Sequence, residues 1–161
     1  MTGRVLTAKR LGKGFRSGDQ TVPVLDDLSL SLGRGASLAV VGRSGSGKST
    51  LLDLLCGLQH PDSGSVTLIG ETFRAGEDAA STGARWAQLR RQSIGVVFQE
   101  TNLMPALSLL ENVGLRAHLA GSQHGDERQW LERLGIGAEA DRYPDQVSGG
   151  QAQRAALAMV F

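Results

Sequence analysis

The sequence lacks the features that mark secreted, membrane-spanning or nucleic-acid-binding proteins. Its single cysteine, Cys56, cannot form an internal disulfide, and its Leu-Leu-Cys-Gly setting is typical of a small buried hydrophobic residue. The 17 Lys and Arg residues balance 16 Asp and Glu residues, which gives no electrostatic reason to expect a nucleic-acid partner. No apolar run approaches the roughly 18 residues of a membrane span, and residues 1–11 lack the apolar core of a signal peptide. We therefore expect an intracellular protein that does not cross a membrane by itself.

Metal-binding motifs and repeats are also missing. The three histidines, His60, His118 and His124, have no carboxylate or cysteine at metal-ligand spacing, so we interpret them as ordinary surface or loop residues. With 161 residues and 40% hydrophobic content, the chain can form one compact domain with a small lobe attached. Function must therefore be sought in local motifs.

Strand and helix patterns alternate along most of the chain. The apolar patterns predict strands over residues 4–11, 22–32, 36–41, 66–69 and 93–98. They predict helices over residues 48–58 and 85–91, one from Leu107 onward, and one that begins near Asp126 as its N-cap. Residues 76–82 are expected to form a loop. The helix over 48–58 is apolar nearly all round, which predicts packing on most of its surface, and Trp130 is expected to be a packing residue.

A phosphate-binding loop follows the apolar run at residues 36–41. Residues 42–50, Gly-Arg-Ser-Gly-Ser-Gly-Lys-Ser-Thr, fit the pattern G-x-x-x-x-G-K-[ST] between a predicted strand and a predicted helix. Glycine-rich turns let successive backbone N–H groups face phosphate oxygens, while Lys48 can reach the β and γ phosphates and the Ser49 hydroxyl can ligate Mg²⁺. The predicted contacts are Gly42, Ser44, Gly45, Ser46, Gly47, Lys48, Ser49 and Thr50. By itself the loop fits kinases, GTPases and many ATPases.

A second motif stands near the end of the chain. Val147-Ser-Gly-Gly-Gln151 precedes an alanine-rich segment that is compatible with a helix. Ser148 and Gln151 also make a plain capping box, so the motif alone does not decide between a helix cap and a ligand site. A helix N-terminus with Ser and two glycines is nevertheless a second place where an anion can bind.

The ordered set of motifs resembles the ATP-binding cassette family over nearly the whole chain. The family signature is Leu-Ser-Gly-Gly-Gln, and here Val147 replaces the leucine. The family also has a glutamine at the end of an intervening strand, and Gln99 in Ile94-Gly-Val-Val-Phe-Gln99 matches it; the alternative is a surface glutamine. An aromatic residue ahead of the second strand stacks on adenine in the family, and Phe15 is the best match; the alternative is a core or loop phenylalanine.

The resemblance implies an α/β fold of the P-loop NTPase class. This fold has a RecA-like core, an antiparallel β subdomain and a helical subdomain, and we expect it to be incomplete at the C-terminus. The expected divisions are a nucleotide-binding core over residues 1–100, a helical subdomain over 101–147, and the signature motif with its helix over 148–161.

The resemblance further implies an ATPase that binds ATP and Mg²⁺ and pairs head to tail with a second nucleotide-binding subunit, identical or not. Ser148, Gly149, Gly150 and Gln151 then contact the γ phosphate held by the other subunit. Lys48 and Gln99 take catalytic roles, and Ser49 and Gln99 serve the metal. A transmembrane permease is the expected partner, and the helical subdomain is expected to contact it. The subunit is therefore expected at the cytoplasmic face of the inner or plasma membrane.

Short details resemble the branch of the family that serves lipoprotein release and macrolide-type efflux. These are Val24-Leu-Asp-Asp-Leu-Ser-Leu, Ser46-Gly-Lys-Ser-Thr-Leu-Leu, Gly57-Leu-Gln-His-Pro-Asp-Ser-Gly and Glu111-Asn-Val. The transported substrate cannot be predicted from them, because substrate choice belongs to the membrane subunit.

Two parts of such an ATPase are not found. The family has a strand ending in Asp-Glu and a later switch histidine, both after the signature helix, and the chain stops at Phe161. We therefore expect a truncated, poorly stable form that binds ATP and hydrolyses little or none. Two alternatives stay open: a non-transport cassette ATPase, disfavoured because residues 99–148 are short and free of cysteine, and a non-catalytic nucleotide-binding fragment.

Overall fold

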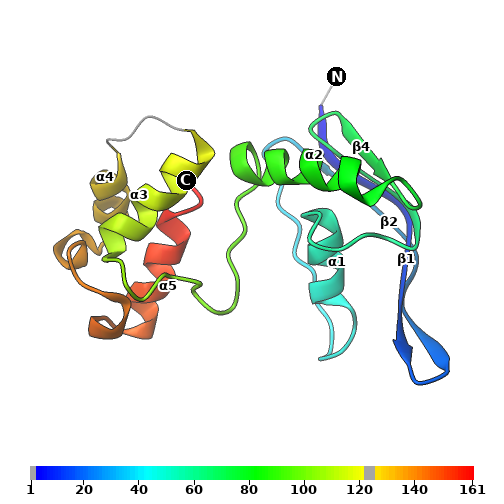
Figure 1. The fold of residues 1–161 in the computed structure, drawn as a ribbon, viewed down its shortest axis with the longest axis horizontal. Coiled ribbons are helices and arrows are strands. Elements are labelled where there is room, and N and C mark those ends of the chain that lie inside the picture. The colour runs from blue at the N-terminus through cyan, green and yellow to red at the C-terminus, as the bar shows by residue number, and fades with distance from the viewer. Residues whose placement is uncertain (1–2, 122–125) are drawn as a thin grey trace. The chain divides into compact units, whose positions relative to one another are not determined.

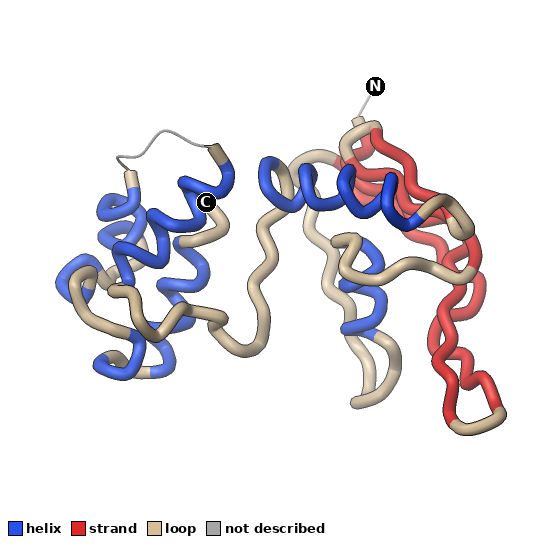
Figure 2. Tube along the Cα trace, viewed as in Figure 1, coloured by secondary structure: helices blue, strands red, loops and turns tan. Residues whose placement is uncertain are grey.

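The computed structural model describes residues 3–121 and 126–161. The chain divides into two compact units, Met1–Ala87 and Gln88–Phe161, which Figures 1 and 2 draw together. His124, which the sequence places in a surface loop, lies outside the described residues. None of the helices among the described residues is long and apolar enough to span a membrane.

The first unit is built on a four-stranded antiparallel sheet (Figure 2). Its strands are β1 (Arg4–Ser17), β2 (Gln20–Gly33), β3 (Ser63–Leu68) and β4 (Glu71–Arg74), in the order β2-β1-β3-β4. β1 and β2 form a long hairpin whose turn begins at Gly18, with a left-handed φ of 62° that glycine adopts without steric cost. The two early strands expected from the sequence are therefore confirmed, and both are longer than the pattern indicates.

Two helices belong to this part of the chain: α1 (Lys48–Leu55) and α2 (Ala79–Gln92), the second of which continues past Ala87. On α1, Leu51 and Leu54 are buried while Leu52 is 52% exposed, so the predicted packing on nearly all sides is wrong. On α2, the Trp86 ring stacks on Phe73 of β4 at 3.9 Å between centroids, which anchors the helix to the sheet. Phe73 and Trp86 belong to different elements, so no local sequence pattern reveals their contact. The expected loop over residues 76–82 is therefore wrong in part, because α2 already begins at Ala79, and β4 has no counterpart among the predicted strands.

Two predicted strands do not form. Residues 36–41 and 93–98 are irregular, and neither pairs with a strand among the described residues. Val41 is 87% exposed and Phe98 is 46% exposed. A strand needs a neighbouring strand to supply hydrogen bonds, and an apolar run also needs its faces covered; residues 36–41 and 93–98 have no such strand neighbour in the described parts of the chain.

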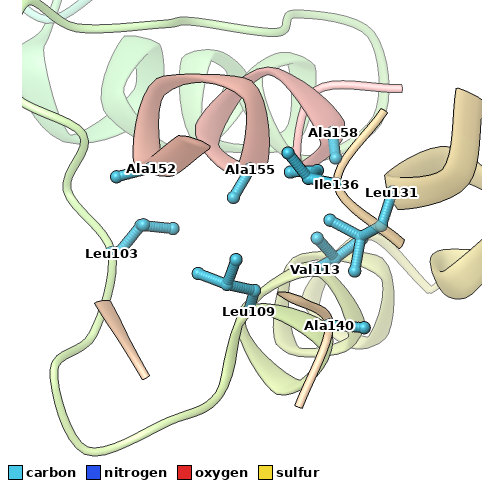
Figure 3. Close-up of a cluster of buried hydrophobic side chains, with 9 residues drawn as sticks. All are labelled: Leu103, Leu109, Val113, Leu131, Ile136, Ala140, Ala152, Ala155 and Ala158. Atoms are coloured by element: carbon cyan, nitrogen blue, oxygen red, sulfur yellow. The ribbon is translucent and has the colours of Figure 1, made fainter. Parts of the chain in front are cut away.

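The second unit is helical. It contains α3 (Leu109–Ala120), α4 (Glu127–Arg133) and α5 (Gly149–Ala158), with short 3₁₀ turns at η1 (Gly137–Glu139) and η2 (Pro144–Gln146). Figure 3 shows the buried side chains that hold these helices together. They are Leu103, Leu109, Val113, Leu131, Ile136, Ala140, Ala152, Ala155 and Ala158. Three of them are alanines of α5, and small side chains let this helix approach its neighbours closely.

The helix boundaries agree with the sequence pattern at several points. Asp126 is the N-cap residue of α4 as expected, although its side chain makes no capping hydrogen bond. Trp130 is half-buried and packs against the core of the unit, which confirms it as a packing residue. His60 and His118 are both exposed, as expected for surface residues. Cys56 is only half-buried, so the expectation of a buried residue is met in part.

Candidate functional site

The glycines of the phosphate loop have the backbone geometry that the motif requires. Gly45 and Gly47 have left-handed φ angles of 78° and 84°, and Gly47 is the N-cap residue of α1. A Cβ on Gly47 would lie 2.8 Å from Val24 Cγ1 and 3.1 Å from the Val24 carbonyl oxygen. Gly47 is therefore required both by its backbone conformation and by the close approach of β2.

Lys48, the first residue of α1, turns its side chain back over the loop. Its Nζ donates hydrogen bonds to the carbonyl oxygens of Gly42 at 2.9 Å and Arg43 at 2.7 Å, and it lies 3.5 Å from Ser46 Oγ. The ammonium group is thereby held among the loop residues.

The start of α1 supplies further polar groups. The first intrahelical bond runs from the Leu51 amide to the Gly47 carbonyl at 2.8 Å, so the amides that precede it have no partner within the helix. The first turn contains Ser49 and Thr50 and no acidic side chain, so no carboxylate competes with an anion for the positive end of the helix. The loop, Lys48 and this helix start fit a nucleotide triphosphate, with Lys48 for its terminal phosphates.

The same residues fit Mg²⁺ only together with a phosphate. No group of three or more His, Cys, Asp or Glu side chains that could hold a metal is found in the part of the chain that the structure describes. The Ser49 hydroxyl is a hard oxygen ligand of the type that Mg²⁺ accepts, and Mg²⁺ commonly takes its remaining ligands from phosphates and water. When bound, the ion neutralises phosphate charge.

Phe15 lies at the far end of β1, where it pairs with Val22 of β2. Phe15 as a whole is 42% exposed, and Lys13 Nζ lies 5.7 Å from its ring centroid. The interpretation as a core phenylalanine is thus wrong, because a core ring would be covered. β2 links the ring to the phosphate loop, since Val22 pairs with Phe15 while Val24 lies against Gly47.

Gln99 and the signature motif both belong to the second unit. Gln99 is exposed in a bend that follows the irregular residues 93–98, rather than at the end of a strand. Its predicted position after a strand is therefore wrong in this structure, and its functional role stays a prediction.

The signature motif forms the N-terminus of α5. The Ser148 side chain accepts a hydrogen bond from the Gln151 amide at 3.3 Å, and the Gln151 side chain accepts one from the Ser148 amide at 2.8 Å, which makes the expected capping box. A Cβ on Gly149 would have no atom within 4 Å, and one on Gly150 would have only an Arg154 nitrogen at 3.9 Å. Nothing in the described chain therefore requires glycine at these two positions.

Comparison with known proteins decides the family. The family model described as "ABC transporter" matches residues 25–161, which include the phosphate loop, Gln99 and the signature motif. The chain belongs to the ABC transporter family. The expected family and its α/β P-loop NTPase fold are therefore confirmed.

Similar cassettes occur in several curated proteins. The chain is 43% identical to the macrolide export ATP-binding/permease protein MacB of Burkholderia pseudomallei, across 98% of this chain and 24% of that protein. It is 42% identical to the lipoprotein-releasing system ATP-binding protein LolD of Xanthomonas campestris, across 96% of this chain and 64% of that protein. The chain thus spans about a quarter of one relative and somewhat less than two thirds of the other.

Solved cassette structures share the fold. A dimeric structure of the ATP-binding cassette MJ0796 in a post-hydrolysis state, bound to ADP and Pi, superposes with a TM-score of 0.83 at 32% identity. The match covers 97% of this chain and 68% of that one. The motifs thus lie in an ABC cassette. Two contacts near the predicted site residues have no signal in the sequence: Asp62 accepts a hydrogen bond from the Gly14 amide, and Glu139 accepts one from the Gln151 side chain. In each case the partner belongs to a different part of the chain.

Proposed function

We propose that this chain is the ATP-binding subunit, or part of it, of an ABC transporter that binds MgATP at residues 42–50. The observation that supports this most directly is Lys48, whose Nζ lies 2.9 Å from the Gly42 carbonyl oxygen inside a glycine loop that opens α1. This geometry gathers backbone donors and one cation in a loop, which supports binding of the β and γ phosphates of ATP there. Ser44, Ser46 and Thr50 complete the polar lining, and Ser49 is assigned to Mg²⁺.

Titration of MgATP into the chain tests this proposal. We expect saturable binding that Lys48→Ala weakens at least tenfold, because the side chain both neutralises phosphate charge and holds the loop carbonyls. Lys9→Ala is the matched control, since Lys9 is an exposed lysine of β1 outside the loop. Equal affinities of the wild-type and Lys48→Ala chains would contradict the proposal.

The signature helix is proposed to complete the site of a second subunit in a head-to-tail dimer. The open space around Gly149 and Gly150 supports this role, because another molecule can approach the backbone amides of α5 there. The Ser148 hydroxyl can also donate to a phosphate while it accepts from the Gln151 amide. ATP would then hold two cassettes together. The MJ0796 cassette, bound to ADP and Pi in a post-hydrolysis state, is dimeric, which supports pairing of two cassettes.

Hydrolysis and transport are proposed for the full subunit rather than for residues 1–161 alone. The proposed catalytic residues are Lys48 and Gln99, and Gln99 would contact the metal and relay the nucleotide state to a transmembrane permease through residues 101–147. We expect no ATP turnover by the 161-residue chain above that of Lys48→Ala, measured by phosphate release. Turnover that depends on Lys48 would contradict this part of the proposal.

A non-transport cassette ATPase is the alternative function. Nucleic acid that copurifies with the chain and remains bound at physiological salt would favour it over transport. The names MacB and LolD describe export and lipoprotein release by those proteins, and they favour a permease partner here.

A further inference from the structure

β1 extends beyond the point where its pairing with β3 ends, shortly before Phe15. The last pair between these strands joins Gly12 to Ser63, the first residue of β3. Beyond Gly12, β1 continues with β2 along its other edge, where Gly14 lies opposite Pro23. The edge of β1 that faces β3 would therefore lose its hydrogen-bond partners at Gly14.

Asp62, the residue before β3, takes the place of the missing strand. Its Oδ2 accepts a hydrogen bond from the Gly14 amide at 2.8 Å, and its Oδ1 accepts one from Lys13 Nζ at 2.8 Å. Its own backbone amide donates to the Gly12 carbonyl oxygen at 2.9 Å. One residue thus binds three consecutive residues of β1, and all three contacts are of the length expected for strong hydrogen bonds.

The ionised carboxylate of Asp62 is favoured by these contacts. The hydrogen bond from Lys13 and then that from the Gly14 amide lower the pKa of Asp62 below its usual value. The Lys13 side chain is only 17% exposed, so it is held against the protein rather than extended into solvent. Asp62 is therefore a charged clamp at neutral pH.

The clamp lies directly before the proposed adenine-stacking residue. Phe15 follows Gly14, and Lys13 Nζ lies within cation–π distance of the Phe15 ring, at 5.7 Å from its centroid. Stacking requires a ring that keeps one orientation, and an isolated two-stranded hairpin is only marginally ordered. Asp62, which directly precedes β3, holds Lys13 and Gly14, the two residues of the β1–β2 hairpin that come before Phe15.

We infer that Asp62 is a positioning residue for nucleotide binding, which fixes the backbone before Phe15 and the ammonium group beside its ring so that the ring can stack on the base. This inference rests on the proposed function of the phosphate loop and on the proposed role of Phe15. It separates the nucleotide site into two parts: residues 42–50 recognise the triphosphate, and the Asp62 clamp recognises the base through Phe15.

Two ligands distinguish these parts. MgATP and magnesium tripolyphosphate share the phosphate chain, but only ATP has a base. We expect Asp62→Ala to weaken MgATP binding by about three- to tenfold, the equivalent of one or two hydrogen bonds, while tripolyphosphate affinity changes less than about twofold. Asp62→Asn, which keeps an acceptor for the Gly14 amide, should give a smaller loss, and Asp141→Ala, which removes another exposed ion pair, should change neither ligand.

A double-mutant cycle with Phe15→Ala assigns the effect to the ring. If Asp62 acts through Phe15, adding Asp62→Ala to Phe15→Ala should cause no further loss of ATP affinity. Equal losses for ATP and tripolyphosphate would overturn the inference, because they would show that Asp62 only supports the fold of the unit. Unchanged ATP affinity in both Asp62 variants would also overturn it. If the wild-type chain binds neither ligand, the proposed function itself is contradicted and the inference falls with it.

Discussion

The side-chain amide of Gln151 donates a hydrogen bond to Glu139 Oε1 at 3.1 Å. Its carbonyl oxygen is also engaged, since it accepts from the Ser148 amide at 2.8 Å. The signature glutamine therefore links η1 to the first turn of α5. Both polar atoms of its side chain are used to hold the helix start, while Ser148, Gly149 and Gly150 are exposed.

Loss of Glu139 should loosen the start of α5. We expect Glu139→Ala to lower the free energy of unfolding of the chain by about 1 kcal/mol, because the Gln151 amide loses a charged acceptor. Urea denaturation followed by circular dichroism measures this change. Asp141→Ala is the comparison, since Asp141 makes an exposed ion pair with Arg128 and should cost less than about 0.5 kcal/mol. Equal losses in the two variants would contradict a specific role for Glu139.

The capping box at Ser148 gives a second prediction. Ser148→Ala removes the acceptor for the Gln151 amide and should lower the free energy of unfolding by about 1 kcal/mol, whereas Ser148→Thr should cost only a few tenths. Thermal unfolding in the absence of nucleotide isolates this structural effect from any contact with phosphate. An alanine variant as stable as the wild type would show that the cap is not formed in solution.

Glycine positions in the phosphate loop should differ in their tolerance of a methyl group. Gly45→Ala places alanine at φ 78° with no atom within 4 Å of its Cβ, so we expect only the cost of backbone strain, about 1 kcal/mol. Gly47→Ala adds contacts at 2.8 and 3.1 Å with Val24 and should cost clearly more, and it should also weaken MgATP binding. Unfolding and binding measurements on both variants test this order, and a reversed order would contradict the geometry.

Asn112 is the main polar residue buried in the helical unit. It is 0% exposed, its Oδ1 accepts from the Met104 amide at 2.7 Å, and its Nδ2 donates to the carbonyl oxygens of Leu107 and Ser108 at 3.0 and 2.9 Å. Asn112→Asp keeps the shape but replaces the donor with a carboxylate oxygen facing carbonyls. We expect a loss of about 3 kcal/mol or more in the free energy of unfolding.

Leu119→Ala on the same helix is the control for this prediction, because Leu119 is 57% exposed and should change stability little. Denaturation at pH 7 measures the loss of unfolding free energy in both variants relative to the wild type. A similar stability for Asn112→Asp and wild type would mean that the carboxylate finds solvent and that the loop from Met104 to Ser108 rearranges.

The Asp62 clamp predicts a defined pH dependence. Because its folded pKa lies below the ordinary value for an aspartate, ionised Asp62 stabilises the fold at higher pH, and this stabilisation is lost as the pH falls through the lowered folded pKa. The difference in unfolding free energy between wild type and Asp62→Asn should thus be constant near neutrality and shrink below about pH 3.8. It should stay under about 1 kcal/mol, since Asp62 is 54% exposed.

The lowered pKa of Glu111, caused by hydrogen bonds from Ser108, acts in the same direction. It is present in both proteins and cancels in the difference. A difference that grows as the pH falls from 5 to 3 would contradict the clamp.

The sequence by itself determined the local parts of this protein. The order of glycines, Lys48 and an apolar helix predicts a loop that opens a helix at Lys48, and Ser148 with Gln151 predicts the cap of α5. The helix start and the cap are both confirmed, because each depends on residues close together in the chain, while the binding role of the loop stays a prediction. Only the tertiary structure decided which apolar runs became strands. Residues 36–41 have the composition of a buried strand, yet a strand needs partners that local pattern cannot supply.

Long-range contacts account for the rest. Lys13 and Asp62 are 49 residues apart, and Gln151 and Glu139 belong to different elements, so neither contact has a local signature. A charged or amide side chain pairs with whichever group the folded backbone brings close to it. From the sequence alone, many other charged surface residues are equally plausible partners for Lys13 or Gln151. The motif therefore predicts which residues bind phosphates, while the packing of β1 against β3 decided what holds the residues beside Phe15.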